Sequence, residues 1–217
     1  MDTKSHFIIT LAEVSQVKNA LKGPFLKGHR EPRLAMVGRS NVGKSSLINR
    51  LLGCPLARTS KQPGKTRALH FYLWGEKKKI LADLPGYGYA RASKDERDRW
   101  ETFISAYLDS DTHLERALVL LDSRHGPTPE DRKVMEFLSL KRIPITVVFT
   151  KVDLLRTQSE RAARTREATQ ALVDLGIDLN SVFWVSSSSK IGLKELVRSF
   201  SIPLNSTRGS EGQCQEE

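Results

Sequence analysis

The sequence is poor in cysteine and has no long apolar run. Its two cysteines, Cys54 and Cys214, lack the spacing of metal ligands, which argues against a zinc site or a disulfide framework and fits a reducing cytoplasm. No apolar stretch approaches the length that spans a membrane, and no basic segment followed by an apolar one stands near the N-terminus. We therefore expect a cytoplasmic protein without a membrane partner.

The composition is that of a folded domain with a basic surplus. Hydrophobic residues make up 39% and charged residues 28% of the 217 residues, enough for one α/β domain with a real core. The net charge of +10 suggests a polyanionic partner beyond any small ligand, most simply RNA. A charged surface that only keeps the protein soluble is the alternative.

Residues 38–45 read Gly-Arg-Ser-Asn-Val-Gly-Lys-Ser, the phosphate-loop pattern Gly-x-x-x-x-Gly-Lys-Ser. An apolar run of strand length, 34–37, precedes the motif, and apolar residues at helical spacing follow it up to Gly53. In this setting backbone N–H groups and the positive end of the helix face one anion. Lys44 is expected to reach the β- and γ-phosphates, and Ser45 to offer its hydroxyl to Mg²⁺.

Strand-like and helix-like segments alternate along the chain, which predicts an α/β fold with a mostly parallel, six-stranded sheet covered by helices on both faces. The strands are expected at 34–37, 69–74, 79–83, 117–122, 145–149 and 182–185. This domain would span residues 34–202. Residues 1–33 form a leader with an edge strand at 7–9 and a short helix at 14–21, and residues 203–217 form a polar tail that we expect to be disordered.

Ligands of such sheets bind at the carboxyl ends of the strands, where Thr150-Lys151-Val152-Asp153 is expected to stand. A carboxylate at Asp153 can accept hydrogen bonds from the ring N–H and the exocyclic amine of guanine, which adenine does not offer. This argues against an ATPase or kinase. Lys151 can lie across the base and fix the phosphate loop, and the small residues after the last strand, from Ser186, let a backbone N–H face the guanine carbonyl oxygen.

Asp83 and Gly86 close another strand in the sequence Asp-Leu-Pro-Gly. Asp83 can hold a water bound to Mg²⁺, the Gly86 N–H can meet the γ-phosphate, and Thr66 could be a second Mg²⁺ ligand. The loops near 59–68 and 86–95 would then respond to the γ-phosphate and relax after hydrolysis.

The order of these motifs resembles that of the bacterial EngB GTPases, also called YihA or YsxC. The resemblance covers about residues 7–200, and Asp-Leu-Pro-Gly-Tyr-Gly-Tyr-Ala at 83–90 is its most particular part. It implies a Ras-like P-loop GTPase fold, Mg²⁺-dependent hydrolysis of GTP to GDP, a role in large ribosomal subunit assembly and a requirement for normal septation in cell division. The expected partners are GTP, GDP and the large subunit or its RNA, and a monomer is expected.

The resemblance also implies the residues of the site. Those expected to catalyse are Lys44, Thr66 and Gly86, and those expected to bind Mg²⁺ are Ser45, Thr66 and, through water, Asp83. The residues expected to contact the nucleotide are Gly38, Arg39, Ser40, Asn41, Val42, Gly43, Lys44, Ser45, Gly64, Lys65, Thr66, Arg67, Ala68, Asp83, Leu84, Pro85, Gly86, Thr150, Lys151, Val152, Asp153, Val185, Ser186 and Ser187.

The motifs do not identify the group that orients the attacking water. Ras-like enzymes carry a glutamine directly after Asp-x-x-Gly, where this chain has Tyr87, so slow turnover stimulated by a partner is expected. Asn41 suggests K⁺ beside the phosphates, or else only an asparagine suited to a tight turn. A nucleotide-gated ribosome- or RNA-binding module with negligible catalysis is the alternative function. The mix of aromatic and basic residues in 87–100 could form an RNA surface, or Trp100 could belong to the core.

Overall fold

The computed structural model describes residues 4–22, 26, 28–58, 68–88 and 94–200. Within these residues one sheet has the strand order β1-β3-β4-β2-β5-β6-β7. The strands are β1 (His6–Leu11), β2 (Arg33–Gly38), β3 (Leu69–Trp74), β4 (Lys79–Asp83), β5 (Leu114–Asp122), β6 (Ile145–Thr150) and β7 (Val182–Trp184). β4, β2, β5, β6 and β7 run parallel, and β3 is antiparallel to both of its neighbours. The predicted α/β class is confirmed.

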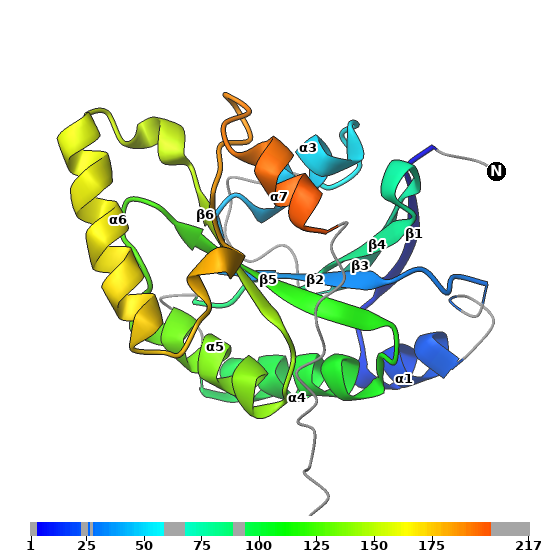
Figure 1. The fold of residues 1–217 in the computed structure, drawn as a ribbon. Helices are drawn as coiled ribbons and strands as arrows, with labels where there is room; N and C mark the ends of the chain where they lie inside the picture. The colour runs from blue at the N-terminus through cyan, green and yellow to red at the C-terminus, as the bar shows by residue number, and fades with distance from the viewer. Residues whose placement is uncertain (1–3, 23–25, 27, 59–67, 89–93, 201–217) are drawn as a thin grey trace, which may run out of the picture.

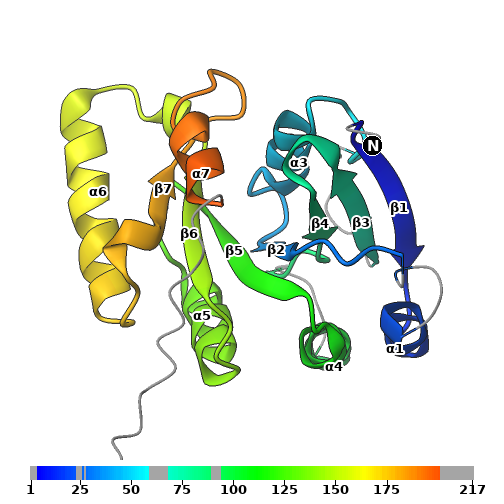
Figure 2. The same cartoon turned by 45° about the vertical axis from the view of Figure 1, so that its right-hand side comes forward.

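Helices cover both faces, as predicted. They are α1 (Val14–Lys22), α3 (Lys44–Leu52), α4 (Lys94–Ser110), α5 (Pro129–Leu140), α6 (Gln158–Val173) and α7 (Leu193–Ser199), with short 3₁₀ turns η1 (Gly75–Lys77), η2 (Val152–Leu154) and η3 (Leu179–Ser181). The apolar residues of α1, α4, α5 and α6 share one core cluster, and those of α3 and α7 share the other. Figure 1 shows α1, α4 and α5 below the sheet and α3 and α7 above it, and Figure 2 shows the same two layers from another side.

The sheet of the described residues has seven strands, one more than the six predicted. The additional strand is β1 from the leader, which pairs antiparallel with β3 from His6 opposite Leu73 to Leu11 opposite Leu69. The short run at 7–9 was expected only as an edge strand of a separate leader. Pairing with β3 satisfies the backbone groups on one side of β1, and Leu11 and the α1 residue Val17 belong to the core cluster that includes β3 residues. The leader is therefore continuous with the sheet.

Local sequence signals place the elements that carry the site. Gly53, with φ 75°, ends α3 in the left-handed conformation that favours glycine. Thr128 begins α5 with a capping box, in which its side chain accepts from the Asp131 N–H and Asp131 accepts from the Thr128 N–H. Strands β3 and β4 have the predicted bounds, and they pair antiparallel as a hairpin joined by η1. Of the described residues, no helix is both long and apolar enough to cross a membrane.

Candidate guanine-nucleotide site

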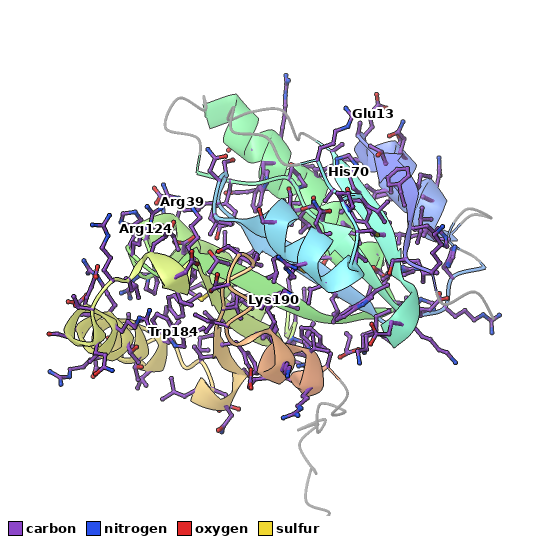
Figure 3. All side chains as sticks on the ribbon, turned by 90° about the horizontal axis from the view of Figure 1, so that it is seen from above. Glu13, Arg39, His70, Arg124, Trp184 and Lys190 are labelled. Carbon is purple, nitrogen blue, oxygen red and sulfur yellow. The ribbon has the colours of Figure 1, made fainter. Side chains whose placement is uncertain are left out.

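The predicted site residues gather at the carboxyl edge of the parallel strands. Gly38, Asp83 and Thr150 are the last residues of β2, β4 and β6, and Ser186 follows β7 after one residue. Figure 3 views the molecule from above and labels Arg39, after β2, together with other residues of this edge. Ala68 lies directly before β3, whereas Gly64, Lys65, Thr66 and Arg67 lie outside the described residues.

The phosphate loop is a tight turn between β2 and α3. Asn41 and Gly43 have φ values of 63° and 105°, both in the left-handed region. No side chain caps the N-terminus of α3, so its first N–H groups are available to an anion. A Cβ on Gly38 would come within 2.9 Å of the Val42 side chain and 3.0 Å of the Leu120 carbonyl oxygen, so the strand end fits only glycine. This geometry suits a bound phosphate chain.

Lys44 and Asp83 form a buried ion pair at the centre of the edge. Lys44 begins α3, and Asp83 ends the neighbouring strand β4. The half-buried Ser45 stands beside Lys44 in the first turn of the helix. A hydroxyl and a carboxylate are hard oxygen donors that fit Mg²⁺. Among the described residues no group of three or more His, Cys, Asp or Glu side chains could hold a metal ion.

The Asp-Leu-Pro-Gly segment lies against the phosphate loop. A Cβ on Gly86 would stand 2.9 Å from the Ser40 Oγ and 3.1 Å from the Ser40 nitrogen, so this approach requires glycine. The next residue, Tyr87, is buried, and its hydroxyl donates to the Asp131 Oδ1 at 2.7 Å. Its side chain therefore points into the core instead of toward the phosphates, where a water-orienting glutamine would act.

Of the two interpretations of residues 87–100, an RNA surface or a core position for Trp100, the structure supports the second for Trp100, which packs against the core. Tyr87 is buried, and Trp100 is half-buried with its Nε1 donating to the Pro85 carbonyl oxygen at 2.8 Å. Neither ring is free to stack on a base. Arg99 is exposed, whereas residues 89–93 and the side chains of 94–97 lie outside the described part of the chain.

The segment expected to read guanine is joined to the phosphate loop. Lys151, in the left-handed conformation with φ 61°, donates from Nζ to the Asn41 carbonyl oxygen at 2.6 Å. The Thr150 Oγ1 lies 2.6 Å from the Val42 carbonyl oxygen, to which it donates. The Val152 N–H donates to the Val185 carbonyl oxygen at 3.3 Å, which ties the strand end to the last loop. Hydrogen bonds thus join the Thr-Lys-x-Asp segment to the phosphate loop and to the residue after β7.

Asp153 is exposed at this edge and accepts a hydrogen bond from the Ser188 Oγ at 3.0 Å. Hydrogen bonding from Ser186 and Ser188 holds the pKa of the Asp153 carboxyl below its usual range, against the opposing effect of burial. The carboxylate is therefore ionised at neutral pH and can accept from a donor pair. Ser188 was not among the predicted contact residues, although it belongs to the serine run at 186–189. The backbone of Ser187, which was among them, accepts from the Arg50 Nε at 2.8 Å.

Asp122, the last residue of β5, is a site residue that the motifs did not indicate. Its Oδ2 accepts from the Lys151 Nζ at 2.9 Å, and Arg124 donates to its two oxygens from Nε at 2.9 Å and Nη2 at 2.7 Å. Burial would raise the pKa of Asp122, but the hydrogen bonds from Arg124 and Lys151 outweigh it, and the pKa lies well below its usual range. The carboxylate therefore fixes the ammonium that holds the phosphate loop.

His70 is a second residue that the motifs did not indicate. It pairs with Asp83 of β4 on one side and with Thr10 of β1 on the other. The Thr10 Oγ1 and the His70 Nδ1 are 2.7 Å apart and form a hydrogen bond. Burial lowers the pKa of His70; the negative charge of Asp83 opposes this, and the positive charges of Lys44 and Arg58 add to it. The leader strand thus reaches the phosphate end of the site.

The sheet, the phosphate loop between β2 and α3, and the Thr-Lys-x-Asp segment after β6 define a P-loop GTPase domain. A family model described as "50S ribosome-binding GTPase" matches residues 33–151. The protein named "Probable GTP-binding protein EngB" of Lactobacillus helveticus is 42% identical over 166 residues, 76% of this chain and 83% of the relative. The chain belongs to the EngB family of GTP-binding proteins.

Further similarities agree with this assignment. The protein of the same name from Gemmatimonas aurantiaca is 43% identical over 166 residues, 76% of this chain and 79% of the relative. A crystal structure described as that of a probable GTP-binding protein engB superposes with a TM-score of 0.61 at 25% identity, covering 78% of this chain and 96% of the other. The match confirms the predicted Ras-like P-loop arrangement of the sheet and helices.

Proposed function

We propose that the protein hydrolyses GTP to GDP and phosphate as a Mg²⁺-dependent switch in the cytoplasm. The bond from Lys151 to the Asn41 carbonyl carries the proposal, because Lys151 contacts the phosphate loop and stands two residues before the ionised Asp153. Asp153 would receive the two N–H donors of guanine, and the N-terminus of α3 would receive the phosphates. An adenine base would leave the carboxylate without donors, which disfavours ATP.

Each catalytic group has a defined task in this proposal. Lys44 would exchange its carboxylate partner for phosphate oxygens, which frees Asp83 to hold a water on the metal ion. Ser45 and Thr66 would supply hydroxyl ligands, and the Gly86 N–H would bind the γ-phosphate. Mg²⁺, when bound, neutralises charge on the phosphate oxygens. The remaining predicted contacts in 38–45, 64–68, 83–86, 150–153 and 185–187 would surround the nucleotide.

Slow intrinsic turnover follows from the direction of Tyr87. The hydroxyl of this residue is engaged by Asp131, so the position after Gly86 offers no group to orient water. A bound K⁺ near Asn41 could assist the reaction, although the left-handed φ of this residue also suits a tight turn. Turnover in KCl compared with NaCl, with Asn41→Ala as control, tests the ion. Equal rates in both salts would exclude it.

Asp153→Asn tests the nucleotide assignment. The variant amide matches xanthine better than guanine, so preference should move from GTP toward xanthosine triphosphate by about two or more powers of ten. Asp174→Asn, an equivalent change at an exposed residue of another surface, should leave the preference unchanged. Undiminished preference for GTP in the Asp153 variant would refute the assignment.

The proposed partner is the large ribosomal subunit or its RNA, with a role in subunit assembly and in normal septation. The description of the matching family and the net charge of +10 support this proposal. The buried Tyr87 also favours the second candidate, a nucleotide-gated binding module with negligible catalysis. Pelleting with subunits in the presence of a GTP analogue or GDP tests gating, and single-turnover hydrolysis with and without subunits distinguishes the two functions. We expect a monomer.

A further inference from the structure

Tyr87 is held from three sides although it directly follows the Gly86 that is proposed to bind the γ-phosphate. Its hydroxyl donates to the Asp131 Oδ1 of α5 at 2.7 Å. Its ring packs edge to face on Trp100 of α4, with 5.5 Å between the ring centroids. Its carbonyl oxygen accepts from the Ser40 N–H of the phosphate loop at 3.0 Å. One residue therefore connects two helices and the phosphate loop.

The Asp131 carboxylate, which accepts the hydrogen bond from Tyr87, is held by hydrogen bonds to both of its oxygens. Asp131 is 2% exposed. Its Oδ2 accepts from the Thr128 N–H at 2.8 Å and from the Thr128 Oγ1 at 2.7 Å, as part of the capping box of α5. Both carboxylate oxygens are thus used, one by the helix cap and the other by Tyr87. Removing the tyrosine hydroxyl would leave a buried charged oxygen without its donor.

The peptide units on both sides of Gly86 are fixed by the same set of contacts. The Pro85 carbonyl oxygen accepts from the Trp100 Nε1 at 2.8 Å, and the Tyr87 carbonyl oxygen accepts from the Ser40 N–H. Gly86 lies between them so closely to Ser40 that a Cβ would have no room. Hydrogen bonds of the flanking peptide units and the close approach of Ser40 therefore fix the orientation of the Gly86 peptide.

We propose that Tyr87 is a positioning residue for the third phosphate. Through Asp131 and Trp100 it holds the Gly86 N–H in the orientation that a γ-phosphate needs. The inference rests on the proposed function, since it assigns the Gly86 N–H to GTP. GDP has no third phosphate and makes no such contact, so the effect must appear in the affinity for GTP relative to GDP. A tyrosine that only stabilised the core would leave this ratio unchanged.

Tyr87→Phe removes the hydroxyl and keeps the ring on Trp100. The affinities for a non-hydrolysable GTP analogue and for GDP are measured by titration, together with the thermal unfolding of each variant. We expect the analogue to bind about fivefold more weakly, the lower end of couplings between sites, with the affinity for GDP within about twofold of the parent. Trp100→Phe, which removes the donor to the Pro85 carbonyl, should change the ratio in the same direction.

Tyr107→Phe is the matched control. Tyr107 is a fully buried tyrosine of α4 that lies beside Asp111, outside the nucleotide edge. This variant should leave the ratio of the two affinities unchanged. If Tyr87→Phe left the ratio of the two affinities unchanged, whether or not both affinities fell, the inference would be overturned while the proposed function stayed intact. Failure of the parent protein to bind either nucleotide would overturn both.

Discussion

Replacing Asp122 should weaken the binding of both guanine nucleotides by a similar factor. The Asp122 carboxylate is the partner that keeps the Lys151 ammonium against the Asn41 carbonyl, at distances of 2.9 and 2.6 Å. The substitution Asp122→Asn keeps the size of the side chain and removes its charge. The amide oxygen can still accept one hydrogen bond, but the ionic part of the contact with Lys151 is lost, and Arg124 loses its bidentate partner.

The magnitude follows from the exposure of the pair. A hydrogen bond to a charged group contributes about 1.5–3 kcal/mol when buried. The side chains of Lys151 and Asp122 are 28% and 14% exposed, so solvent screens part of this energy. Retention of a neutral acceptor reduces the loss further. About 1 kcal/mol, or roughly a fivefold rise in Kd, is therefore expected for GDP and for a GTP analogue alike.

Stopped-flow release of a fluorescent guanine nucleotide measures this effect, because a loosened Lys151 should act mainly on the dissociation rate. Asp109→Asn is the control, since Asp109 of α4 forms another ion pair with a lysine, Lys141, which directly follows α5. The control should release nucleotide at the parent rate. Parent-like release from Asp122→Asn would refute the view that this carboxylate positions Lys151. Faster release of the GTP analogue alone would mean that Asp122 acts on the phosphate contacts instead.

Three further predictions concern stability. Gly192→Ala should lower the free energy of unfolding in urea by about 3 kcal/mol or more, because φ is 66° and a Cβ would stand 2.1 Å from a β7 carbonyl oxygen. Gly53→Ala, where φ is 75° and the surrounding space is open, should lower it by only about 1 kcal/mol. Burial lowers the pKa of His70 on folding, so its contribution to stability is complete above about pH 6.5 and is lost as pH falls below it. In His70→Asn the unfolding free energy should therefore depend less on pH below about pH 6.5 than in the parent. Asn49→Ala should cost about 2 kcal/mol in the same unfolding assay, since its side chain makes two hydrogen bonds with the Ala57 backbone at 2.7 and 2.8 Å; a loss below about 0.5 kcal/mol would contradict this.

The parts of the fold that sequence could predict are those encoded locally. The phosphate loop needs glycines at fixed positions, and the strands at 69–74 and 79–83 depend on runs of neighbouring residues. These features were recovered with bounds close to those observed. The membership of β1 in the sheet depends on a partner about sixty residues away, Thr10 opposite His70 for example. No local pattern specifies such a pairing, so the sheet was predicted one strand short.

The candidate site shows the same division. Lys44, Asp83 and Lys151 stand in short motifs and were selected directly. Asp122 stands in no motif, and its role depends on β5 lying next to β6, which places its carboxylate opposite Thr150 and near the lysine that follows. Tyr87 was recognised as a missing amide, but the direction of its side chain depends on the position of α5. Residues whose roles arise from strand order or helix packing require the structure.

The contacts that Tyr87 and Asp122 support at the phosphate loop should respond independently to substitution. Ser40 is bonded to the Tyr87 carbonyl and Asn41 to Lys151, but Tyr87 and Asp122 share no hydrogen-bond partner in the described structure. The free-energy losses of Tyr87→Phe and Asp122→Asn should therefore add to within about 0.5 kcal/mol in the affinity for a GTP analogue. The affinity of the double variant for GDP should equal that of Asp122→Asn alone, because GDP lacks the phosphate that the tyrosine serves. A larger coupling in the double-mutant cycle would mean that the turn at 40–41 transmits strain between base and phosphate, and that the two supports hold one element.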